Sequence, residues 1–219
     1  MNKSLKVVKN QLPEGAAMEE VLNYFKSGEV KANALDTVNW KEYPYCPEVS
    51  FKIAHNCDEI FLQFNVVEEG VRGTFECDYG SQPWTDSCVE FFMIPDPAKP
   101  DYFNVEMTCI GHGTFACGPN RAERHNFDDS VISRIRRVAS LGSSKIVKES
   151  GRCEWSLTLA IPFEIYGIDG AAVSGKTLKA NFYKCGDDMP VLHFVSWNPI
   201  GCPQPDFHRP EYFGDIIFE

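Results

Sequence analysis

The sequence predicts an all-β protein, an antiparallel β-sandwich of the jelly-roll or immunoglobulin-like kind, with one short helix near its start. Apolar residues after Trp40 recur at every second position in about nine or ten short segments, which is the spacing of half-buried strands. The connections between these segments are too short to hold the helices that a parallel sheet requires. We therefore expect residues 38–219 to form one sandwich domain and residues 1–37 to form an N-terminal extension that carries the helix.

One helix and one hairpin are predicted first along the chain. Apolar residues three and four positions apart predict a helix within residues 14–29. Residues 49–55 alternate between apolar and polar, residues 56–59 have the composition of a turn, and residues 60–66 alternate again, which indicates a hairpin. The apolar positions are Met18, Val21, Leu22 and Phe25 in the helix, and Ile60, Leu62, Phe64 and Val66 in the second strand.

Further strands follow at short intervals. The segment 87–94 is apolar on nearly both sides, and the three prolines that follow it prevent its continuation. In the segment 153–163, Trp155 and the apolar residues at every second position after it are expected to face the core. The segment 131–140 fits a helix or a strand, and we favour a strand. The other predicted strands are residues 102–110, 178–186, 192–197 and 213–219.

Composition and charge argue against several classes of partner. The chain has 219 residues, of which 43% are hydrophobic, and a formal net charge of −10. We expect no nucleic-acid partner, because phosphate binding needs clustered Lys and Arg. The one short basic cluster, Arg134, Arg136 and Arg137, is expected to be a solvated strand face. We expect no membrane partner, because no apolar run approaches the length of about 20 residues that a span needs. No signal peptide is visible, so the location is left open between the cytoplasm and export after trimming.

The nine cysteines are scattered singly along the chain and form no CxxC pair. This pattern indicates neither a zinc motif nor a redox motif. We therefore expect free thiols, most of them buried as small apolar side chains in a reducing compartment.

Two neighbouring predicted strands carry polar side chains. Glu90 lies within an otherwise apolar strand, and Asn104 and Glu106 share one face of the next strand. A buried carboxylate without partners is strongly destabilising, so Glu90 either pairs with a structural partner or faces a ligand. The polar row beside it favours a wet groove, and Trp84 at its mouth suits a stacking platform. Flat aromatic rings combined with planar polar groups are what sugar recognition needs.

Five blocks of the sequence carry a resemblance to a known family. They are WTDSCVEFFMIP, CEWSLTLAIPF, ANFYKCGD, HFVSWNPI and PDFHRPEYFGDIIF. In their order and spacing they resemble carbohydrate-binding module family 9, and most of all the stand-alone family-9-like proteins of the wider DOMON-like group. The resemblance covers residues 38–219. It implies a β-sandwich that binds sugars, in the founding members at the reducing end of a glycan chain between two aromatic rings, and an association with polysaccharide breakdown beside glycoside hydrolases.

The resemblance implies a ligand-binding site at the matching positions. Trp84 lies six residues before Glu90, as the family's first stacking Trp lies before its sugar-binding Glu. Phe207 lies six residues before the Phe-Gly pair of the last block and matches the second stacking aromatic, with Phe in place of Trp. Asn104 matches the family's polar strand position. We expect Trp84 and Phe207 to stack on a sugar, and Glu90 and Asn104 to bind its hydroxyls.

Four further residues are candidate ligand contacts. His208 and Arg209 follow the second stacking residue and could contact hydroxyl or carboxylate groups, or instead pair with Glu211 and fix the loop. Lys184 lies near a strand end and could extend along its aliphatic stem into the groove. Trp197 also ends a strand and is either a core residue or an aromatic at the rim.

A glycoside hydrolase is the first alternative function. Such an enzyme needs a pair of carboxylates beside the scissile bond. Glu90 could form this pair with Glu106 or with Asp86. The resemblance argues against catalysis, since family-9 modules are usually carried beside hydrolases and are not themselves catalytic.

A haem-binding domain is the second alternative, since a related DOMON branch holds haem through Met and His. Met107 is the candidate methionine, and His193 and His208 are the candidate histidines. No other cofactor is expected, except that the resemblance leaves structural calcium open. The candidate oxygen donors for calcium are Asp128, Asp129, Asp187 and Asp188.

Overall fold

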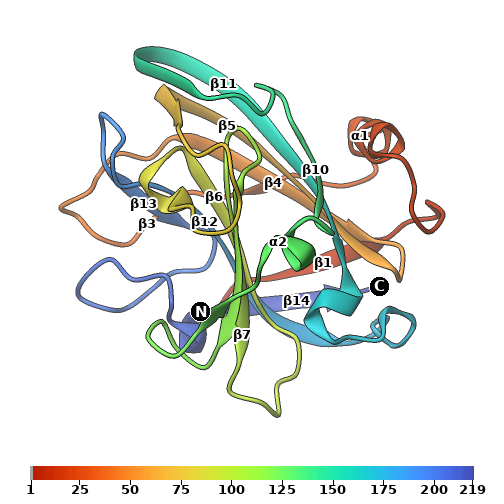
Figure 1. The fold of residues 1–219 in the computed structure, drawn as a ribbon. Helices are drawn as coiled ribbons and strands as arrows, with labels where there is room; N and C mark the ends of the chain where they lie inside the picture. The colour runs from red at the N-terminus through yellow and green to blue at the C-terminus, as the bar shows by residue number, and fades with distance from the viewer. Residues whose placement is uncertain (1) are drawn as a thin grey trace.

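Residues 2–219, which the computed structural model describes, contain one continuous mixed sheet that curls into two packed layers (Figure 1). The first layer contains β10 (Arg136–Ala139), β11 (Ile146–Pro162), β5 (Glu59–Gly73), β4 (Glu48–His55) and the short β2 (Asn33–Ala34). The second layer contains β14 (Gly214–Phe218), β12 (Thr177–Gly186), β6 (Cys88–Ile94), β7 (Tyr102–Thr108), β8 (Gly113–Gly118), β9 (His125–Asn126), β13 (His193–Ser196) and β3 (Thr37–Val38). β1 (Ser4–Lys9) joins the two layers.

β1 makes the sheet mixed, which corrects the prediction of a purely antiparallel one. Its first residues pair in parallel with β14, and its last two residues pair in parallel with β4. Leu5 and Val7 of β1 are buried in the core between the layers. Two alternating apolar positions flanked by lysines are a weak strand signal, which is why the pattern did not predict this strand.

β5 and β11 are longer than the short strands that were expected. They span 15 and 17 residues and pair along nearly their whole lengths, with one irregularity between Lys148 and Arg152. Trp155 faces the core as predicted, together with the apolar residues at every second position after it. Charged residues in the paired segments 68–72 and 148–152 hide the true lengths of both strands, because they do not alternate with apolar ones.

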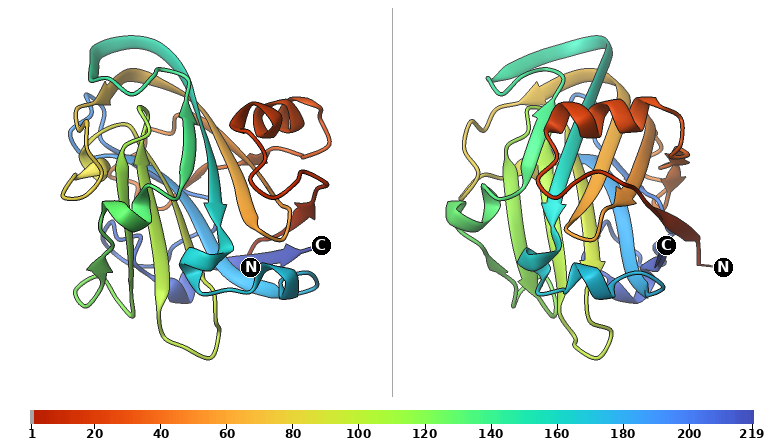
Figure 2. Two further views of the ribbon diagram at one scale, coloured as in Figure 1. Left: turned by 45° about the vertical axis from the view of Figure 1, so that its right-hand side comes forward. Right: turned by 90° about the vertical axis from the view of Figure 1, so that its right-hand side faces the viewer.

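Helix α1 (Met18–Lys26) confirms the predicted N-terminal helix. Val21 and Phe25, one turn apart, are fully buried against Ala54, Phe61 and Ala160. These three residues are neighbours on β4, β5 and β11, so α1 covers one end of the outer face of the first layer (Figure 2). The domain boundary at residue 38 stays a prediction.

The segment 131–140 is part helix and part strand, which corrects the prediction of a single strand. The helical turn α2 (Asp129–Ile132) overlaps its start, and β10 forms its end. The carboxylate of Asp128 accepts the backbone N–H of Ser130 and caps this turn. The cap lies just outside the apolar pattern, so the pattern alone could not separate the two elements.

The basic cluster of this region is paired rather than freely solvated, which corrects another expectation. Arg136 lies 2.6 Å from Glu59, and Arg137 lies 2.7 Å from Asp78. The side chains of Arg136 and Arg137 are 31% and 19% exposed. Their partners lie 77 and 59 residues away along the chain, so local charge patterning does not show them.

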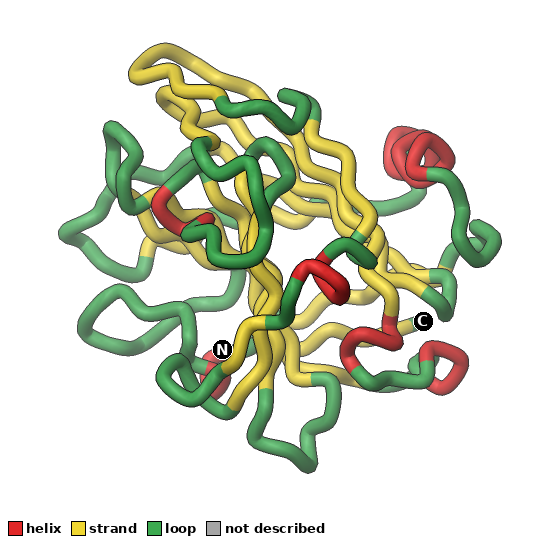
Figure 3. The backbone as a smooth tube through the Cα atoms, in the orientation of Figure 1, coloured by secondary structure: helices red, strands yellow, loops and turns green. Residues whose placement is uncertain are grey.

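Helical structure in residues 2–219 is limited to α1, α2 and four short 3-10 turns (Figure 3). None of these helices combines the length and the apolar composition that crossing a membrane requires. The 3-10 turns are η1 (Pro83–Thr85), η2 (Phe163–Tyr166), η3 (Gly170–Ala172) and η4 (Pro210–Tyr212).

Candidate functional site

One pocket collects several of the predicted site residues on the outer face of the second layer. Strands β6, β7 and β12 supply its floor, and η1, the loop from β8 to β9 and the segment before η4 supply its walls. It contains about 590 Å³ of space, open solvent included. The lining residues are Trp84, Glu90, Glu106, Arg121, Arg124, Cys185, Asp187, Phe194, Pro205, Asp206, Phe207 and His208.

Glu90 lies at the floor of this pocket. It is 3% exposed, and it makes no ion pair with any residue in the described range 2–219. The Cys185 thiol donates a hydrogen bond to Glu90 Oε1 at 3.1 Å. Burial, with further contributions from Cys185 and Glu106, raises the pKa of Glu90 well above its ordinary value. The floor therefore offers a carboxyl group that can hold a proton and donate as well as accept a hydrogen bond.

Glu106 lies directly opposite Glu90 in the register of β6 and β7. Asn104 Nδ2 donates to Glu106 Oε1 at 2.7 Å, and Arg124 Nη1 lies 3.4 Å from the same oxygen. Burial raises the pKa of Glu106, while Arg124 and Asn104 oppose the rise. Asn104 is 1% exposed and does not line the pocket, and its amide N–H contacts Glu106.

His208 is a neutral hydrogen-bonding residue in the pocket wall. Arg124 Nη1 lies 2.7 Å from its Nε2 and 3.1 Å from its Nδ1, and the Tyr102 hydroxyl lies 2.8 Å from Nδ1. Burial, followed by the positive charges of Arg124 and Arg121, lowers the pKa of His208 to about 2. These contacts fix the last loop of the chain against β7.

We expect His208→Gln to remove one source of acid destabilisation. Because the pKa of His208 is depressed in the fold, the unfolded chain takes up a proton below about pH 6.5 that the folded chain does not. The unaltered protein should therefore lose about 1.4 kcal/mol of unfolding free energy per pH unit below 6.5, relative to the variant. Above about pH 6.5 the difference between the two should be constant.

Urea unfolding between about pH 7.5 and 5.5 measures this difference. His125→Gln, which replaces an exposed histidine of strand β9, is the matched control for the loss of a histidine side chain. If the unfolding free energies of His208→Gln and the unaltered protein differ by the same amount at every pH, His208 is not held neutral in the fold.

The two predicted stacking residues line the same pocket. Trp84 on η1 is half-buried. Phe207 is 8% exposed, because its ring stacks on Tyr183 with centroids 4.2 Å apart and also packs against Trp40. Phe194 lines the pocket as a further, half-buried ring. Trp84 therefore has more ring surface free for a ligand than Phe207 has.

Asp86 anchors the loop that presents Trp84 and does not line the pocket. It is fully buried, with Arg72 Nε at 2.9 Å and the Thr74 hydroxyl donating to it at 3.0 Å. The backbone N–H of Asp187 donates to the Trp84 carbonyl at 2.9 Å and ties η1 to the end of β12. Asp86 is thus a structural residue, and it cannot serve as one carboxylate of a catalytic pair in this pocket.

Three predicted ligand contacts lie outside the pocket. Lys184 is fully buried between the two layers, 2.7 Å from Glu68 Oε2. Trp197 is 4% exposed and belongs to the core between the layers. Arg209 pairs with Glu211 at 2.7 Å beside η4. Sequence alternation did not separate these positions from the groove, because residues of both faces follow the same period.

Sequence reasoning did not place the charged residues of the pocket walls at the candidate site. Arg121 and Arg124 come from the loop between β8 and β9, Asp187 follows β12, and Asp206 precedes η4. Loop residues follow no periodic pattern, so spacing does not show which way they point. The spacing of the two arginines was no signal either, since Arg134 and Arg137 are also three positions apart and do not line the pocket.

The aspartate pairs at residues 128–129 and 187–188 do not bring three side-chain ligands together. Asp128 instead accepts the N–H and the hydroxyl of Ser130. Among residues 2–219, the one group of three converging His, Cys, Asp or Glu ligand atoms comes from β6 and β12 and includes two thiols. Calcium takes oxygen donors, so we assign it to none of these residues.

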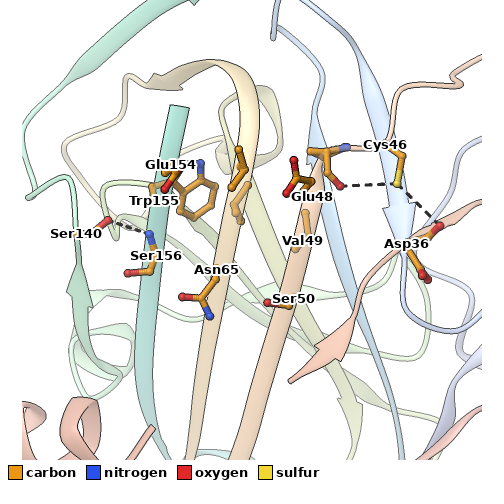
Figure 4. A pocket seen from close by; sticks show the side chains of 13 residues that line it. Asp36, Cys46, Glu48, Val49, Ser50, Asn65, Ser140, Glu154, Trp155 and Ser156 are labelled. Carbon is orange, nitrogen blue, oxygen red and sulfur yellow. Dashed lines mark hydrogen bonds between the residues drawn. The ribbon is translucent and has the colours of Figure 1, made fainter. Parts of the chain in front are cut away.

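A wider depression lies on the outer face of the first layer (Figure 4). Ser50, Asn65 and Ser156 form a polar row across β4, β5 and β11. Trp155 lines the depression but is 4% exposed, and its indole N–H donates to Glu68 inside the protein. None of the described residues that line this depression offers an exposed aromatic ring for stacking, so the pocket above Glu90 is the better candidate for sugar binding.

Comparisons with known proteins support the observed fold and the family that the sequence blocks resemble. The model of carbohydrate-binding family 9 matches residues 19–218. A crystal structure of a proposed carbohydrate-binding protein from Bacteroides uniformis is 38% identical, covers 100% of both chains and has a TM-score of 0.94. No curated protein matches the chain.

Two structures of a family 9 module from Caldicellulosiruptor kristjanssonii share the fold at 12% identity. The complex with glucose has a TM-score of 0.58 and covers 99% of this chain and 96% of that one. The complex with cellotriose has a TM-score of 0.56 and covers 99% and 94%. The family model spans nearly the whole sequence and confirms the resemblance seen in the five blocks: the chain belongs to carbohydrate-binding family 9.

Proposed function

We propose that the protein binds carbohydrate without catalysis, holding a mono- or disaccharide or the end of a glycan chain in the pocket above Glu90. The observation that carries this proposal is the meeting of Trp84 and Phe207, from distant parts of the chain, around a floor of buried polar groups. A sugar ring can stack on an aromatic face while its hydroxyls bind planar carboxyl and guanidinium groups. Family membership supports the same ligand class.

Each pocket residue has a distinct role in this proposal. Trp84 is the main stacking platform, and Phe207 closes the site with its remaining free surface. Glu90 and Glu106 bind hydroxyls, and Arg124 holds Glu106 in place while donating to the ligand. His208 fixes the wall. Asn104 acts through Glu106, and Lys184, Trp197 and Arg209 are left out because they do not line the pocket.

Isothermal titration with a panel of mono- and disaccharides tests the proposal. Glucose and cellotriose head the panel, since they are the ligands of the family 9 module from Caldicellulosiruptor kristjanssonii. We expect weak binding, because the sugar must shed well-hydrated hydroxyls. We also expect each borohydride-reduced sugar to lose its binding, as recognition of a reducing end requires. Absence of heat across the whole panel would contradict carbohydrate binding, and equal binding of reduced sugars would contradict end recognition. An association with polysaccharide breakdown follows if glucan fragments bind best.

The glycoside hydrolase alternative is supported less well. Glu90 and Glu106 do line the same pocket, but they are register partners on adjacent strands and are 3% and 2% exposed. Catalytic carboxylates flank the scissile bond, with room for water in an inverting enzyme. Two buried neighbours on one floor suit hydroxyl binding better than attack from two sides.

The haem alternative is also supported less well. Met107 faces the core on one side of β7, whereas His208 contacts Tyr102 on the other side. One iron cannot take both as ligands. His193 is fully buried and already hydrogen-bonded to Lys184. The wider DOMON-like relationship stays a prediction from the sequence blocks.

A further inference from the structure

Two thiols and one carboxyl group converge at the floor of the pocket. Cys88 and Glu90 are two residues apart on β6 and therefore share its outer face. Cys185 lies directly opposite Cys88 on β12. The three ligand atoms lie within 4.8 Å of one another, and all three side chains are buried. Adjacent strands thus hold the donors in place without help from any loop.

Glu90 brings a carboxyl group into this buried cluster without a positively charged partner. It is 3% exposed and faces the two thiols, and no Lys or Arg within the described residues forms an ion pair with it. Arg124, one of the two arginines of the pocket, is paired with Glu106. A buried carboxylate without a positively charged partner is strongly destabilising, so it either keeps a proton or takes up a cation.

The arrangement differs from that of the other buried cysteines. Cys109 and Cys153 lie in the apolar core between the layers. Cys117 lies on β8, outside the group of converging ligand atoms.

We propose that Cys88, Cys185 and Glu90 form a binding site for a thiophilic divalent cation of the Zn²⁺ class, with its fourth coordination position open to the pocket. Zn²⁺ is held by thiolates at about 2.3 Å and by carboxylate oxygens at about 2.0–2.2 Å in tetrahedral geometry. Tetrahedral angles then separate the donor atoms by about 3.5–3.8 Å, which lies within the observed limit of 4.8 Å. Side-chain adjustments alone can close the site.

The donor set selects the metal. Two thiolates favour Zn²⁺ and its softer analogue Cd²⁺, whereas Ca²⁺ and Mg²⁺ require a shell of oxygens. The thiols and the carboxyl must release their protons when the metal binds, so affinity should rise with pH. Cys185 and Glu90 line the pocket, so the open position faces solvent and can hold water. This inference does not depend on sugar binding, because the metal is measured without sugar.

Titration of the reduced, metal-stripped protein with Cd²⁺ tests the site, since thiolate coordination produces an ultraviolet charge-transfer band. We expect one equivalent of Cd²⁺ to develop the band fully. Excess Zn²⁺ should displace the Cd²⁺ and remove the band, and competition with a chromophoric chelator measures the affinity for Zn²⁺. Cys88→Ser and Cys185→Ser should each lose this band. Glu90→Gln should keep part of it and weaken binding at least about tenfold, because even residues that only support a ligand are worth that much.

Cys117→Ser is the matched control, because it removes a buried thiol of the same layer outside the cluster, and it should bind like the unaltered protein. Circular dichroism shows which variants are folded, and alanine replaces serine at any position where serine prevents folding. A folded protein without the band, a band that survives the loss of Cys88 and Cys185, or displacement of Cd²⁺ by equimolar Ca²⁺ would each overturn the proposal. Titration of the same samples with sugar tests the carbohydrate proposal separately, so failure of the metal proposal and failure of the carbohydrate proposal are distinguishable.

Discussion

Trp84→Ala should abolish measurable sugar binding while leaving the protein folded. The ring is half-buried on η1 and lines the pocket, so the variant loses the largest free aromatic surface of the site. Covering roughly 80 Å² of indole at about 25 cal/mol per Å² stabilises a complex by about 2 kcal/mol. This corresponds to a roughly thirtyfold change in Kd. Because one sugar site is weak to begin with, such a loss moves binding out of calorimetric range.

Folding should survive this change because Trp84 lies outside the core between the layers. It packs at the edge of the buried residues on the outer face of the second layer, among them Phe92, Tyr102 and Tyr183, and Asp86 anchors its loop independently. Tyr79→Ala is the matched control, since Tyr79 lies in the same connection between β5 and β6, is 57% exposed and does not line the pocket. Titration with glucose should separate the two variants. Unchanged affinity in folded Trp84→Ala would remove this residue from the site.

Alternation predicted those parts of the fold in which one face of a strand is apolar. The hairpin after Trp40 and the inward row that starts at Trp155 are such parts, and the structure confirms both. β1 escaped prediction because its position depends on partners at the far end of the chain. Its parallel pairing with β14 brings together residues 4–7 and 215–218, and no local pattern carries that information.

Site residues, like strands, could be predicted where the signal is local and could not be predicted where it depends on distant contacts. Trp84, Phe207 and Glu90 could be named because the sequence blocks preserve their spacing, and all three line one pocket. Arg124 could not be named, because its role comes from contacts with Glu106 and His208 that join separate loops and strands.

Lys184 shows the limit of reasoning from periodicity. It shares the face of β12 with Ala180 and Phe182, and this is the inner face. A charged residue near a strand end suggested a solvent-facing groove. In the fold its ammonium group is instead fully enclosed, because acceptors from other segments surround it.

Lys184→Met should destabilise the protein strongly. The ammonium group forms an ion pair with Glu68 Oε2 at 2.7 Å, and it donates to His193 Nε2 at 2.7 Å and to the Cys185 carbonyl at 3.0 Å. Burial and the nearby positive charge lower the pKa of His193 well below its ordinary value, so its Nε2 is free to accept. Removing one member of a buried ion pair costs about 3–5 kcal/mol, because the other charge stays buried and unpaired. For a chain of this size the unfolding midpoint should fall by roughly 6–20 °C.

Lys179→Met is the matched control, since Lys179 lies on the same strand but pairs with Asp215 at a half-exposed site. That change should cost less than about 1 kcal/mol.

Adding Glu68→Gln to Lys184→Met should restore part of the lost stability, because it removes the unpaired charge and keeps an oxygen for the Trp155 indole N–H. Glu68 is on β5 and Lys184 is on β12, so this pair connects the two layers through the core. Equal midpoints for the two lysine variants would show that the pair contributes nothing to holding the layers together, and the stability of the sandwich would then rest on its apolar contacts alone.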